Sequence, residues 1–281
     1  MLRVACALGV TLLLAFPSFA DEPFRFNDGD RVVLLGGTLI EREQKYGRWE
    51  EALVAYNAPR NFTLRNLGWS GDTVYGESRA SFDPPAKGYE RLVTLTKSLN
   101  PTVVVVCYGA NESFDGDAGL GRFRMGLTKL LDDLAPTKAR VVLLSPPPFE
   151  GVAAANNVNL AKYAGVLEET AHSRKLGYRS LAAAPPAAEN GLHFDDGGYR
   201  KLAPLLFSTT VAPTDTPALR AKIVEKNQLF FHRWRPQNET YLFGFRKHEQ
   251  GKNGAEIPQF DPLGEKAEAE IAVMAKKLPQ K

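Results

Sequence analysis

The segment LLGGTLIERE, residues 34–43, is an apolar run that ends in two glycines and a threonine and then changes to charged, helix-forming sequence. Residues 31–35 are predicted to form a buried strand, because continuous Val and Leu runs are typical of strands covered on both faces. The break at Gly36 and Gly37 therefore predicts a tight turn from strand into helix. It places the hydroxyl of Thr38 at the head of that helix.

The same pattern recurs along the chain. Three further apolar runs are predicted strands, at residues 63–67, 102–108 and 140–145. Helix-compatible segments lie between or after them, at residues 89–99, 123–134 and 159–176. This alternation predicts a three-layer α/β fold, a doubly wound parallel sheet with helices on both faces, as in flavodoxin-like proteins. In such a sheet, ligands bind at the carboxyl ends of the strands.

Composition limits the class of protein. The chain has 281 residues, of which 44% are hydrophobic and 24% charged, so it can bury a large core. One α/β domain with a smaller appendage fits this length. The formal net charge of +3 is too small to predict a nucleic-acid partner.

Residues 1–20 are predicted to be a secretory signal peptide. Arg3 precedes an apolar stretch at residues 4–16 that is short for a membrane span, and Ser18-Phe19-Ala20 fits a small-x-small cleavage site. We expect cleavage after Ala20, a secreted or periplasmic protein, and no stable membrane insertion once the signal is removed. The alternative is an uncleaved anchor. The mature chain would keep only Cys107, which closes an apolar run and is expected to be a buried hydrophobe.

The sequence changes character near residue 212, so the predicted domains are 21–212 and a C-terminal appendage at 213–281. A helix is expected at residues 218–231 and another at 263–277. Between them, residues 230–248 are rich in aromatic and cationic side chains. Two interpretations remain open for this segment: it docks the appendage onto the main domain, or it forms a wall that binds a sugar or an anionic polymer.

Four short motifs fall in loops beside the predicted strand ends. They are Gly36-Gly37-Thr38-Leu39, Gly68-Trp69-Ser70-Gly71-Asp72-Thr73, Gly109-Ala110-Asn111-Glu112 and Asn190-Gly191-Leu192-His193. In this order they resemble the four sequence blocks of the SGNH/GDSL hydrolases over about residues 30–210. The resemblance implies an SGNH hydrolase-like α/β fold and cleavage of carboxylic esters. It implies neither a metal nor an organic cofactor.

The resemblance also implies roles for individual residues. Thr38 occupies the nucleophile position and His193 the position of the base, while Asn190 stands where the family has an acid. The oxyanion hole would consist of the Thr38 amide, Gly71 and Asn111. Physical chemistry favours the same arrangement, because a hydroxyl at a helix N-terminus lies in the positive field of free backbone N–H groups.

Two departures from the family pattern affect catalysis. The nucleophile is Thr38 instead of Ser, preceded by Gly37 instead of an acid, and the β-methyl of threonine crowds the attack path. Asn190 can orient an imidazole but cannot stabilise an imidazolium by charge. Thr38 could alternatively act only as a helix cap.

Nearby carboxylates are the other candidates for the missing acid. Asp195 and Asp196 either supply it or cap a helix that begins near residue 198, and Glu189 is a further candidate. Glu112, beside Asn111, either reaches the site or, as we expect, is a solvated loop acid. His172, His232 and His248 have no metal-ligand spacing.

The leading prediction is thus an exported esterase acting on acyl, foremost acetyl, esters of carbohydrate or small alcohols. The alternative is a weakened or inactive relative that binds glycan or a protein partner.

Overall fold

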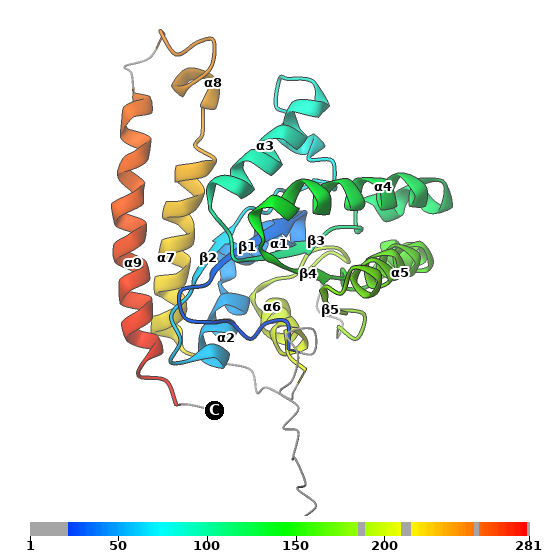
Figure 1. The fold of residues 1–281 in the computed structure, drawn as a ribbon, viewed down its shortest axis with the longest axis horizontal. Coiled ribbons are helices and arrows are strands. Elements are labelled where there is room, and N and C mark those ends of the chain that lie inside the picture. Colours follow the sequence, from blue (N-terminus) through cyan, green and yellow to red (C-terminus); the bar gives the residue numbers. More distant parts are fainter. Residues whose placement is uncertain (1–21, 185–188, 209–214, 250–252, 280–281) are drawn as a thin grey trace, which may run out of the picture.

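A computed structural model describes residues 22–184, 189–208, 215–249 and 253–279 (Figure 1). The predicted signal peptide and the predicted boundary at residue 212 lie outside these ranges. Within them, no helix is both long and apolar enough to cross a bilayer.

The core of the fold is a five-stranded parallel sheet with the order β2-β1-β3-β4-β5. Its strands are β1 Arg31–Gly36, β2 Thr63–Asn66, β3 Val103–Cys107, β4 Arg140–Leu144 and β5 Gly177–Arg179. The predicted doubly wound α/β fold and its first four strands are confirmed. The fifth strand was not predicted from the sequence, because it is only three residues long and has no apolar run.

Helices cover both faces of the sheet (Figure 1). The described residues form α1 Thr38–Tyr46, α2 Arg48–Asn57, α3 Pro85–Ser98, α4 Gly116–Leu134, α5 Asn157–Arg174, α6 Asp196–Leu202, α7 Pro217–Trp234, α8 Glu239–Leu242 and α9 Phe260–Ala275. One hydrophobic cluster joins the sheet to α1, α2 and α6, and a second joins its other face to α3, α4 and α5. Alternate β3 residues enter the two clusters: Val103 and Val105 the first, Val104 and Val106 the second.

The C-terminal helices α7 and α9 lie side by side at the β2 edge of the sheet (Figure 1). A third hydrophobic cluster joins them to α2 through Val54, Ile223 and Ile271. A buried ion pair adds to this contact: Lys226 Nζ on α7 lies 2.6 Å from Glu50 Oε1 on α2 and donates to the Leu64 carbonyl of β2 at 2.9 Å. Helix α7 is therefore held to the main sheet by apolar contacts and by charge.

Candidate active site

The end of β1 and the loop after β2 both require glycine for steric reasons. A Cβ on Gly36 would lie 2.5 Å from the Cys107 carbonyl oxygen, and one on Gly68 would lie 2.2 Å from the backbone nitrogen of Glu41. The loop after β2 can therefore pack directly on the first turn of α1. This contact brings the loops that follow β1 and β2 together at one edge of the sheet.

Thr38 is the first residue of α1, and Gly37 is the N-cap, which has no side chain to make a capping bond. The hydroxyl oxygen of Thr38 instead accepts a hydrogen bond from the Gly71 N–H at 3.2 Å. The alternative that Thr38 only caps its helix is therefore wrong. Its hydroxyl faces the next loop, at the helix end where backbone N–H groups have no intrahelical acceptor.

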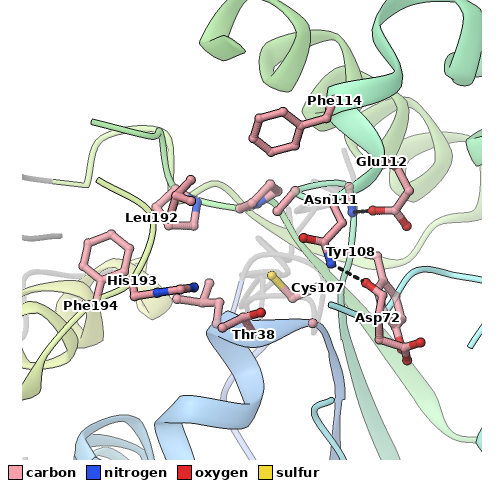
Figure 2. A pocket seen from close by; sticks show the side chains of 16 residues that line it. Thr38, Asp72, Cys107, Tyr108, Asn111, Glu112, Phe114, Leu192, His193 and Phe194 are labelled. Atoms are coloured by element: carbon pink, nitrogen blue, oxygen red, sulfur yellow. Dashed lines mark hydrogen bonds between the residues drawn. The ribbon is translucent and has the colours of Figure 1, made fainter. Parts of the chain in front are cut away.

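Gly71 and Asn111 come from the loops that follow β2 and β3. Gly71 has φ +75°, in the left-handed region that glycine adopts without strain. Asn111 Nδ2 donates to the Asp72 carbonyl oxygen at 2.8 Å, as the dashed line in Figure 2 shows. A primary amide has two N–H groups, so one of them remains for a ligand.

His193 is oriented by Asn190. The amide oxygen of Asn190 accepts from the backbone N–H groups of Leu192 at 3.2 Å and His193 at 2.9 Å, which directs its nitrogen at His193 Nδ1, 3.0 Å away. An amide nitrogen only donates, so Nδ1 must be the acceptor and the ring proton lies on Nε2. In an Asp-His pair the proton lies on Nδ1, and Nε2 is free to act as a base.

Burial and the Arg42 charge both favour the neutral form of His193. Burial lowers the pKa of His193 below its ordinary value; the Arg42 guanidinium lowers it further, and Glu189 opposes the change. Arg42, one turn after Thr38 on α1, also lies 2.8 Å from Glu189 and 3.4 Å from the Phe194 carbonyl oxygen. It therefore tethers the histidine loop to the helix of Thr38, a role that the sequence analysis missed.

The other carboxylates near His193 are engaged elsewhere. Asp195 caps α6 by accepting from the Gly198 N–H at 2.8 Å, as one of the two alternatives predicted. Asp196 pairs with Arg48 at 2.5 Å. Glu189 pairs with Arg42, and none of the three has a described hydrogen bond to the His193 ring.

Thr38, Asn111 and His193 line one cavity of about 100 Å³. Figure 2 shows the three side chains around it, with Phe114 across the cavity from Thr38 and His193. No described hydrogen bond joins Thr38 to His193, so a base-to-nucleophile contact would require a rotation or a bound substrate. Cys107 also lines the cavity, but burial raises its pKa to about 12, so it is no competing nucleophile at neutral pH.

Glu112 is not the solvated loop acid expected from the sequence. It is buried, and its two carboxylate oxygens accept from the N–H groups of Val74 and Gly109, both at 2.9 Å. Burial raises its pKa to about 7. The carboxylate therefore fastens two of the site loops together.

Asp72 and Arg79 form a second buried support beneath the site. Arg79 Nε donates to Asp72 at 2.7 Å, and the pair is almost entirely shielded from solvent. The sequence analysis missed this pair as well. Among the described residues, no group of three His, Cys, Asp or Glu side chains is placed to hold a metal ion.

The fold is a parallel five-stranded sheet, and its strand-end loops bring Thr38, Gly71, Asn111 and His193 together. This combination of fold and site is that of the SGNH-type hydrolases. Comparison with known sequences gives the family: residues 25–201 match the GDSL-like lipase/acylhydrolase family, and the chain belongs to it. Membership of this family supports the assignment of the chain as a carboxylic ester hydrolase. Among curated proteins, none is significantly similar in sequence.

Solved structures of other proteins are similar to this chain, and two with a TM-score of 0.52 share its fold. A catalytic mutant of Axe2, an acetylxylan esterase from Geobacillus stearothermophilus, is 16% identical with a TM-score of 0.52, over 64% of this chain and 93% of that one. Another Axe2 variant from that organism is 17% identical with a TM-score of 0.52, over the same shares of the two chains. The aryl esterase of M. smegmatis is 16% identical with a TM-score of 0.48, over 62% of this chain and 95% of that one.

Proposed function

We propose that this chain is an exported esterase that removes small acyl groups, acetyl foremost, from carbohydrates or small alcohols. The observation that carries the proposal is the Thr38 hydroxyl, which lies at the start of α1 and 3.2 Å from the Gly71 N–H, in the cavity that His193 and Asn111 also line. The acetylxylan esterase activity of Axe2, which shares the fold, supports the substrate class.

The reaction would proceed by acyl transfer. Thr38 Oγ attacks the ester carbonyl and gives its proton to His193, which returns the proton to the leaving alcohol. The Thr38 and Gly71 N–H groups and the Asn111 amide would stabilise the oxyanion. Water then attacks the acyl-enzyme and releases the acid. The scheme uses neither a metal nor an organic cofactor.

The size of the cavity limits the acyl group. An engineered protein cavity of about 150 Å³ holds benzene, whereas the cavity beside Thr38 has about 100 Å³. An acetyl group fits this space better than an aromatic or long-chain acyl group. Large substrates would therefore leave the alcohol part outside the cavity.

A second candidate function, binding of a glycan or a protein partner without hydrolysis, is favoured by the Asn190 amide. It donates to His193 Nδ1 and so keeps the ring proton on Nε2. In this tautomer, Nε2 donates a hydrogen bond and cannot accept the Thr38 proton. Catalysis would then be slow and would depend on the less populated tautomer.

Hydrolysis of an aryl acetate tests both candidates. We expect slow turnover by the unmodified protein and its loss in Thr38→Ala and His193→Ala, because each removes one reacting group. Thr38→Ser should raise the rate, since it keeps the hydroxyl and removes the crowding methyl. His172→Ala, a change of an exposed histidine on α5, is the matched control and should keep the full rate.

Two outcomes count against the esterase. Activity that persists in both Thr38→Ala and His193→Ala would belong to another site. No hydrolysis by the unmodified protein across a panel of acyl esters would favour the binding protein.

A further inference from the structure

A second and larger cavity lies between α3 and the C-terminal end of α7. It has a volume of about 560 Å³ and shares no lining residue with the cavity beside Thr38. We call it the α3–α7 groove; it is lined by Trp69, Arg79, Asp83, Lys87, Glu90, Arg91, Thr94, Leu95, Ser98, Trp234, Arg235 and Glu239. Trp69 belongs to the same short loop as Gly71, so the groove begins two residues from the proposed oxyanion hole.

Two tryptophans from distant parts of the chain meet in this groove. Trp69 and Trp234 pack edge to face with ring centroids 5.8 Å apart, and the Arg235 guanidinium lies 3.5 Å from the Trp69 ring centroid. Tryptophan rings provide flat apolar surfaces with a polar N–H at one edge. Arg235 covers one face of Trp69, so a sugar ring, with its flat apolar faces and polar edges, would pack on the parts of the two indoles that stay exposed in the groove.

The charges of the groove cancel locally. Its four cations are all paired with carboxylates: Arg79 with Asp72, Lys87 with Glu90, Arg91 with Asp83, and Arg235 with Glu41. Each lysine and arginine of the groove already has a carboxylate partner, which an anionic polymer would have to displace. This argues for an uncharged ligand over a polyanion.

Two buried donors in the groove wall lack acceptors. Arg79 Nη1 and Trp234 Nε1 have no hydrogen-bond partner among the described residues, although both atoms are shielded from solvent. Buried N–H groups are almost always satisfied in folded proteins. Because both atoms are shielded, a ligand reaches them only if the groove wall shifts on binding; hydroxyl and ether oxygens would then offer the missing acceptors.

We propose that the α3–α7 groove binds the sugar chain of a neutral, acylated polysaccharide while its acetyl group enters the cavity beside Thr38. The proposal rests on the proposed function for its acetyl group only; the groove binds the sugar chain with or without the ester. The first half of the aromatic segment at residues 230–248 then both docks α7 and forms a wall of the binding site.

Binding of deacetylated polymers tests the groove without any hydrolysis. Affinity gel electrophoresis would compare soluble xylan and glucomannan, which are neutral, with polygalacturonate, which is anionic. We expect retardation by a neutral polymer, and a loss of affinity of about tenfold or more in Trp234→Ala. Trp234→Phe keeps a ring and should retain part of the affinity. Phe245→Ala, a change of an exposed aromatic outside the groove, is the matched control.

Thermal unfolding of each variant separates loss of binding from loss of fold, and Trp234→Phe supplies the comparison if Trp234→Ala unfolds. The proposal is overturned if no neutral polymer binds, if Trp234→Ala and Trp234→Phe both bind as tightly as the unmodified chain, or if polygalacturonate binds more tightly than the neutral polymers. An absence of aryl acetate hydrolysis would count against the proposed esterase activity, but it would leave the measured binding of deacetylated polymers unaffected.

Discussion

At the scale of single residues, the amide of Asn190 decides the state of His193. Its oxygen is occupied by two backbone N–H groups, so its nitrogen must face Nδ1. Replacing the nitrogen with an oxygen would reverse the hydrogen bond, move the ring proton to Nδ1 and free Nε2. The change alters few atoms, yet it converts His193 Nε2 from a hydrogen-bond donor into a base.

We therefore predict that Asn190→Asp raises the rate of ester hydrolysis, by up to the roughly four orders of magnitude that separate acid and amide in a Ser-His-Asp triad. The new carboxylate should also raise the pKa of His193, which burial and Arg42 now lower. Because a base must be unprotonated, the acid limb of the kcat/KM profile should move to higher pH. Steady-state rates against pH check both effects. An unchanged rate and profile in a folded variant would mean that Asn190 does not control the tautomer.

Sequence alone predicted which loops carry the candidate residues, and for a physical reason. In a parallel sheet all strands end at one edge, so motifs after β1, β2 and β3 must lie near one another. The state of Glu112 was not predictable in this way. Its burial depends on the N–H groups of Val74 and Gly109, which belong to two different loops and meet only in the folded chain.

At the scale of elements, apolar runs predicted the buried strands well because both faces of β1 and β3 are covered. The edge strand β5 was missed, since a Gly-Tyr-Arg segment has no hydrophobic period. The ion pair between Glu50 and Lys226 was also beyond prediction. It joins α2 to α7 across 176 positions of sequence.

We predict that Lys226→Met destabilises the protein by about 3 to 5 kcal/mol, because it leaves the Glu50 carboxylate buried without a partner. The double variant Glu50→Leu/Lys226→Met should recover most of this loss, since no unpaired charge remains. Urea unfolding measures both. Lys87→Met, which breaks an exposed pair with Glu90, is the control and should change stability by at most about 1 kcal/mol. Equal losses of stability at the two sites would show that the buried pair contributes no more than the exposed pair.

At the scale of the whole molecule, the three layers bury carboxylates that form no ion pair with any described residue. Glu43 accepts from the backbone N–H groups of Trp49 and Glu50, and Glu112 from those of Val74 and Gly109. Burial raises the pKa of both carboxyls. Each therefore holds its proton more tightly in the folded chain than in the unfolded one. The protein as a whole should then lose stability as these groups ionise.

The sign of the effect follows from proton linkage. A raised folded-state pKa contributes stability that is fully present below the unfolded value and is lost as the pH rises through the folded value. For Glu112 the window runs from 4.5 to about 7. A shift of this size corresponds to on the order of 3 kcal/mol. Glu112→Gln cannot ionise, so its free energy of unfolding should fall less than that of the unmodified chain across this window. Urea unfolding at pH values below, within and above the window measures the difference, and parallel curves for the two proteins would show that Glu112 does not titrate there.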